Sequence, residues 1–186
     1  RYSSINDCDI TGDLTLGSVY NSTIRDSRIA NIHVTNTVDQ FSIMHSIVGD
    51  IVFEKSAVLT ITNSTVQGTI RSTEIGLHTD RVHIMGRLFA HTLTIGSTLR
   101  ESTFDGMVSI DSDVYDVNLR DSSFDVLQAS LYGANTILQN TYIKNAYASY
   151  EDSSMANCPD DIKKVFQCTD NIYDQHVYYA FNSGVE

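Results

Sequence analysis

Apolar residues recur along the chain at a period near 19 residues, and the polar positions between them recur in the same order. The phrase Ile24–Ile32 can be laid on Ile43–Ile51, and the first residue of each copy defines an anchor position. The anchors are Ile5, Ile24, Ile43, Ile61, Leu77, Leu99, Leu119 and Leu138. A period this short, without a helical pattern inside it, is typical of one turn of a solenoid built from short strands.

Three further positions in each copy carry residues of one kind. The fifth residue after the anchor is apolar and should point inward with the anchor. A small residue stands three after the anchor, where a hydroxyl at a tight inward corner can bond the backbone. This column comprises Cys8, Ser27, Ser46, Ser64, Asp80, Ser102, Ser122 and Thr141. Residues that tolerate a left-handed bend stand seven after the anchor, namely Gly12, Asn31, Asp50, Gly68, Gly106 and Asn145.

These columns predict an all-β fold, a right-handed parallel β-solenoid of about eight coils over residues 1–150. Further apolar pairs suggest three apolar sides in each turn. The fifth copy, which starts at Leu77, is degenerate and suggests an insertion at His83–Gly86. A β-sandwich with irregular strands is the alternative fold.

Residues 151–186 break the pattern and predict a small C-terminal cap. Pro159 and the acidic residues after it favour a short helix over Asp160–Gln167. Cys158 and Cys168 lie close together in this segment and suggest a disulfide in an oxidising compartment. Because a solenoid end exposes a sheet edge, we expect this segment to cover it. A contact with a partner is the alternative.

Composition narrows the classes of partner. The net charge of −11 argues against nucleic acid, because binding phosphates requires clustered lysines and arginines. No stretch of 18 apolar residues occurs, so membrane insertion is not expected. The sequons at Asn21 and Asn63 are candidate glycosylation sites. Together with the expected disulfide, they favour an extracellular, cell-surface or virion-surface location.

Catalytic chemistry has one weak signal. The carboxylate pairs Asp7/Asp26 and Glu101/Asp121 fall on adjacent coils, where acid/base pairs of polysaccharide-cleaving enzymes could stand. Corner turns favour aspartate for conformational reasons alone, and this is the interpretation we prefer. The histidines fall in different columns and suggest no metal site, and no glycine-rich phosphate loop opens a helix. We therefore expect neither catalysis nor a cofactor.

Exposed aromatic residues are the candidate binding residues. They lie at outward positions of different coils and are Tyr20, Phe89, Tyr115, Tyr132 and Tyr147. Aromatic side chains held on a rigid scaffold commonly recognise proteins or glycans. Packing against a second copy of the chain is the alternative use of the same residues.

The repeat over roughly residues 5–148 resembles the parallel β-helix repeats of surface adhesins, phage and virus attachment proteins, and pentapeptide-like solenoids. The phrase Ile10–Leu16 is also similar to repeats in receptor L-type domains of fungal wall proteins. These resemblances imply a non-enzymatic surface protein in adhesion, in receptor or glycan binding, or in structure. An intracellular scaffold and a polysaccharide-active enzyme are the alternatives.

Overall fold

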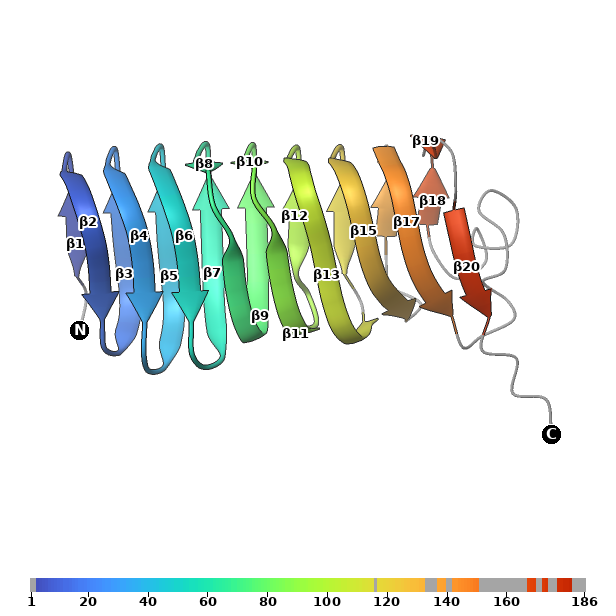
Figure 1. Cartoon of the computed structure of the whole chain (residues 1–186), viewed down its shortest axis with the longest axis horizontal. Helices are drawn as coiled ribbons and strands as arrows, with labels where there is room; N and C mark the ends of the chain where they lie inside the picture. The colour runs from blue at the N-terminus through green and yellow to red at the C-terminus, as the bar shows by residue number, and fades with distance from the viewer. Residues whose placement is uncertain are drawn as a thin grey trace.

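The chain forms a parallel β-solenoid, a rod of about six turns in which each coil stacks on the next (Figure 1). The computed structural model describes the backbone of residues 3–115, 117–132, 137–139, 142–150, 167–169, 172–173 and 177–181. Side chains are described for residues 3–111 and 117–129. The described residues contain strands and no helix.

Two series of strands form the two long faces of the rod. The first, the anchor face, carries the anchor residues and comprises β1 (Ser4–Asn6), β3 (Val19–Arg25), β5 (Val38–Met44), β7 (Ala57–Thr62), β12 (Thr98–Arg100), β14 (Asn118–Arg120), β16 (Ile137–Gln139) and β18 (Gln167–Thr169). The second face comprises β2 (Asp9–Leu16), β4 (Arg28–Val34), β6 (Ile47–Phe53), β8 (Thr65–Val66), β10 (His83–Ile84), β11 (Leu88–Leu93), β13 (Thr103–Tyr115), β15 (Ser123–Tyr132), β17 (Tyr142–Tyr150), β19 (Ile172–Tyr173) and β20 (Val177–Phe181). Strand β9 (Ile70–Asp80) starts on the second face and ends on the anchor face.

The predicted register of the first four coils is confirmed. Ile24 pairs with Ile5 on one side and Ile43 on the other, and Ile29 pairs with Val48. These inward side chains are buried, with Ile43 at 0% and Ile24 at 1% exposure. Removing each such side chain from water stabilises the fold by about 1.5–3 kcal/mol.

Each regular coil has two strands rather than three separate sides. Val19 and Val38, the expected start of the third side, begin β3 and β5, which run on to the anchors Ile24 and Ile43. Only a local kink interrupts these strands, where Asn21 (φ 44°) and Gln40 (φ 56°) adopt the left-handed conformation in adjacent coils.

Corner hydroxyls form a ladder along the rod, as expected. The Oγ of Ser46 accepts a hydrogen bond from the N–H of Ser27 at 3.1 Å and donates to the carbonyl of Met44 at 2.7 Å. Equivalent bonds continue through Ser64, Ser102 and Ser122. Each buried hydroxyl thus satisfies a buried N–H of the preceding coil, which would otherwise cost about 1–3 kcal/mol.

The predicted alignment of the fifth coil is wrong by two residues. Thr79, rather than Leu77, occupies the anchor position between Ile61 and Leu99. A buried threonine is tolerated there because its Oγ1 lies 3.0 Å from the Oγ of Ser102, within hydrogen-bond distance of another hydroxyl. Ile84 takes the fifth position, between Val66 and Phe104, so no insertion is needed at residues 83–86.

The left-handed bend also lies elsewhere than predicted. It falls two residues after the anchor, and its members are Asp7, Asp26, His45, Asn63, Arg81, Glu101 and Asp121, with φ between 46° and 55°. In the column seven after the anchor, no described residue has a positive φ. There Asn31 and Asp50 instead accept bonds from the N–H groups of Asp50 and Thr69. The side chains of Asn31 and Asp50 therefore connect adjacent coils and do not form the turn.

Val82 takes the serine position in the fifth coil. Its own N–H donates to the Oγ of Ser102, but valine has no hydroxyl to accept from the N–H of Ser64, so the hydroxyl ladder is interrupted here. We expect Val82→Thr to leave the melting temperature nearly unchanged, because the new hydroxyl meets backbone groups at the corner. Val66→Thr, in the apolar core column, should lower stability by about 1–3 kcal/mol because its hydroxyl is buried without a partner. If Val82→Thr and Val66→Thr lower the melting temperature equally, the hydroxyl ladder does not contribute to stability.

The described strands of the C-terminal segment continue the parallel pairing. Cys168 in β18 pairs with Leu138, and β19 and β20 pair with β17, so these strands stack on the preceding coil. Figure 1 places them at the end of the rod opposite the N-terminus. Cys158 and the helix expected over residues 160–167 lie outside the described residues, except that Gln167 belongs to β18.

Candidate functional site

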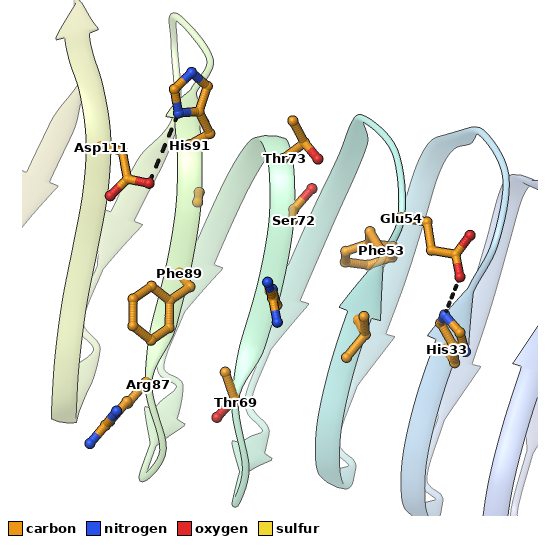
Figure 2. A pocket seen from close by; sticks show the side chains of 13 residues that line it. His33, Phe53, Glu54, Thr69, Ser72, Thr73, Arg87, Phe89, His91 and Asp111 are labelled. Carbon is orange, nitrogen blue, oxygen red and sulfur yellow. Dashed lines mark hydrogen bonds and ion pairs between the residues drawn. The ribbon is translucent and has the colours of Figure 1, made fainter.

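A groove of about 780 Å³ crosses the second face of the rod, over β4, β6, β9, β11 and β13 (Figure 2). Alternate residues of a strand point to the same side, so neighbouring coils build an array of outward side chains. Five coils at about 4.8 Å each span roughly 19 Å between the first and the last. The groove is therefore elongated along the rod axis.

The centre of the groove combines one aromatic ring with two arginines. Arg87, just before β11, and Phe89 and His91 within it alternate with the buried residues Leu88 and Ala90 and so point outward. Arg71 of β9 pairs in register with Phe89. The ring of Phe89 is half-buried and so presents a partly desolvated apolar surface between the two cationic side chains.

A histidine–carboxylate pair stands at each end of the groove (Figure 2). His33 Nε2 lies 2.9 Å from Glu54 Oε1, and His91 Nδ1 lies 3.9 Å from Asp111 Oδ2. Both pairs bridge neighbouring coils and are substantially exposed. Glu54 and Asp111 therefore stand at the two ends of the groove, three coils apart. Arg71 and Arg87 lie at its centre.

The base of the groove is rigid. Phe53, Ser72 and Ala90 are buried beneath it. The Oγ of Ser72 donates to the carbonyl oxygen of Glu74 at 2.8 Å, which fixes the bend between the two faces. A backbone held by parallel pairing on both sides keeps the outward side chains in place before any ligand arrives.

The structure does not bring the predicted aromatic residues together in one site. Phe89 lies in the groove, whereas Tyr20, 42% exposed, lies on β3 of the anchor face. Tyr115 and Tyr132 pair in register at the ends of β13 and β15. Tyr147 of β17 follows Gln128 in the same outward column as Phe89. The side chains of these last three tyrosines lie outside the described residues.

The candidate modification sites are on the surface or outside the described chain. Asn21 and Asn63 are exposed, and both adopt the left-handed conformation. Cys8, in the serine column, is a free thiol and is half-buried rather than buried, because it belongs to the first described coil. The Cys158–Cys168 disulfide involves a residue outside the described part and stays a prediction.

The acidic pairs fit turns better than catalysis. Asp7, Asp26, Glu101 and Asp121 are all left-handed corner residues. Glu101 forms an ion pair with Arg100 at 2.8 Å, and Asp26 lies 3.5 Å from His45. These carboxylates thus stand exposed at corners, and two of them lie beside a basic side chain.

The carboxylates of the groove are also poorly placed for glycoside hydrolysis. Glu54 and Asp111 stand three coils apart, about 14 Å along the rod. The two carboxylates of a glycosidase stand roughly 5–9.5 Å apart. This spacing suits contacts to separate parts of a ligand.

Metal ligation and membrane insertion find no support in the described residues. Within them no group of three or more histidine, cysteine, aspartate and glutamate side chains could hold a metal ion. The same part of the chain contains no helix long and apolar enough to cross a membrane.

The groove itself was not predicted, although one signal for it was present. The alternation Arg87-x-Phe89-x-His91 places one cationic, one aromatic and one imidazole side chain on the same side of the chain. Asp111 directly follows Ile110, which pairs with Ala90, so it stands beside His91 on the adjacent coil, a neighbour that the alternation along one strand does not reveal.

The comparisons with known proteins give no relatives. No protein-family model matches the chain, and no curated protein or solved structure matches it.

Proposed function

We propose that this protein is a non-enzymatic β-solenoid of a cell or virion surface that binds a protein or glycan through its groove. The observation that carries the proposal is Phe89, a half-buried aromatic ring flanked by Arg71 and Arg87 on a preformed surface. Aromatic side chains, phenylalanine among them, and arginine are enriched at the buried centres of protein interfaces. Rigid display lowers the entropic cost of binding.

The proposal includes the finer architecture. We infer a right-handed solenoid of about eight coils whose last coil is covered by residues 151–186, with a Cys158–Cys168 disulfide. The parallel pairing of β18, β19 and β20 with β16 and β17 supports a covering role for this segment. Exposed Asn21 and Asn63 are accessible to glycosylation on a secreted chain.

An intracellular scaffold is the second candidate, favoured by the free, half-buried thiol of Cys8. Mass mapping of the protein from its native source separates the two candidates. A Cys158–Cys168 disulfide with modified sequons supports the surface protein, whereas reduced cysteines and unmodified asparagines support the scaffold.

The binding role is tested by Phe89→Ala with Tyr20→Ala as its matched control. Both variants remove an accessible aromatic ring, but Tyr20 lies on the other face of the rod. We expect Phe89→Ala to weaken binding to cells or to a protein and glycan array at least about tenfold, as loss of a central contact does. Tyr20→Ala should bind as the unaltered protein does. Undiminished binding by Phe89→Ala, or no binding by the unaltered protein, would count against the proposal.

A further inference from the structure

We propose that the groove binds an acidic oligosaccharide, with a carboxylate or sulfate of the ligand on Arg71 and Arg87 and a sugar ring on Phe89. This inference rests on the proposed function and names the ligand class of the same groove. Three features of the groove support it: the charge at its centre, the ring between the arginines, and its length.

The charge at the centre of the groove favours an anion. The chain carries a net charge of −11, and two arginines outside the groove pair with adjacent carboxylates, Arg81 with Asp80 and Arg100 with Glu101, whereas Arg25 and Arg28 form no ion pair among the described residues. Arg71 and Arg87 have no such ion pair among the described residues. Their guanidinium groups are therefore available to form paired hydrogen bonds with a carboxylate or sulfate, the geometry that arginine favours.

The carboxylates of the groove do not neutralise this centre. Glu54 is held by His33 at 2.9 Å, and Asp111 faces His91 at 3.9 Å, one at each end. The groove thus alternates acidic ends with a basic middle. A ligand with hydroxyls along its length and an anionic group near its centre matches this pattern.

Phe89 favours a sugar over a flexible peptide. Its ring lacks a polar tip and is half-buried, with Arg71 in register on the adjacent coil and Arg87 two residues before it in the chain. Such a flat apolar surface suits the C–H face of a pyranose ring. The coil spacing of about 4.8 Å is close to the length of one sugar unit, so successive sugars can meet successive coils.

The experiment compares the full chain with matched pairs of oligosaccharides that differ only in charge. The pairs are uronate and neutral hexose oligomers, sialylated and desialylated chains, and sulfated and desulfated chains. Calorimetry should show at least one acidic member binding tenfold or more tightly than its neutral counterpart. Arg71→Gln/Arg87→Gln should abolish this preference, and Phe89→Ala should weaken the acidic and neutral members alike.

The control removes the same charge elsewhere. Arg25→Gln/Arg28→Gln alters two arginines at a corner outside the groove and should change affinity less than threefold. An equal loss in this control would mean that net charge, not the groove, selects the ligand, which overturns the inference.

The other outcomes separate the inference from the proposed function. Equal affinity for neutral and acidic sugars overturns the acidic ligand but leaves glycan binding in place. Binding of an acidic peptide through Arg71 and Arg87, with no sugar bound, overturns the glycan and leaves a binding groove. If no sugar binds, the inference fails, and the Phe89→Ala comparison on cells judges the proposed function by itself.

Discussion

Phe104→Ala is expected to lower the free energy of unfolding by about 3–5 kcal/mol, the range for deleting a large buried aromatic side chain. Phe104 and Phe124 occupy the same inward column on adjacent coils, and each is 1% exposed. Their rings stack with centroids 4.7 Å apart and planes 8° from parallel. Truncation therefore removes apolar burial and leaves a cavity against the remaining ring. Chemical denaturation measures the effect.

Ile95→Ala is the matched control for this prediction. Ile95 is also a large apolar residue, but it is 71% exposed at a turn, so its loss should change stability by less than about 0.5 kcal/mol. A Phe104→Ala variant as stable as Ile95→Ala would show that the stacked coils around β13 and β15 are not packed as described.

The linear architecture determines where such damage appears. In a solenoid each coil contacts only its neighbours, so stability is approximately a sum of local terms. Loss of Phe104 should increase hydrogen exchange first in β13 and β15 and much less in β3 and β4. Since β13 also supplies Asp111 to the groove, that end of the groove should loosen before the other.

The sequence predicted the fold well wherever a column demanded one kind of side chain. Ile24 and Ile43 had to be aliphatic because each is buried between two isoleucines of the adjacent coils. The serine column was readable for a similar reason, since one hydroxyl serves two backbone groups in each coil that carries a serine there. Because these requirements repeat in successive coils, they produce a period that can be recognised in a single sequence.

The prediction failed at positions where two types of residue can satisfy the same structural requirement. Thr79 replaces an aliphatic anchor because Ser102 satisfies its hydroxyl, and Val82 replaces a serine. The alignment consequently slipped to Leu77. The left-handed corner was interpreted as a turn only at its carboxylates, because Asp7, His45 and Arg81 share a backbone conformation but no side-chain chemistry.

The groove could not be predicted from the columns, because each column describes only one position of the coil. Phe89 was identified as an outward aromatic residue, but its significance depends on Arg71, 18 residues away and adjacent through the register. Outward residues vary freely between coils because stacking does not constrain them. Which of them form a site follows only once the coils are placed side by side.

Gly86→Ala should destabilise the rod by at least about 1–3 kcal/mol, although alanine is the smallest possible addition. A Cβ at Gly86 would meet the backbone carbonyl group of Gly68 in the preceding coil, and a Cβ at Gly106 would meet that of Gly86. The neighbour is backbone held by parallel pairing, so the coils must separate to make room. Gly86 has no left-handed φ, so close stacking rather than a turn requires glycine here.

Gly17→Ala isolates this effect from the general cost of replacing a glycine. A Cβ at Gly17 would meet no atom within 4 Å, and its φ is not positive. Its replacement should be neutral or stabilise by about 0.4–1 kcal/mol, because it restricts the unfolded chain. Thermal and chemical denaturation of both variants give the comparison.

Because Arg87 follows Gly86 directly, Gly86→Ala should also weaken ligand binding at the groove, whereas Gly17→Ala should not. Equal stability of the two variants would show that the coils at Gly68 and Gly86 are farther apart than the structure places them.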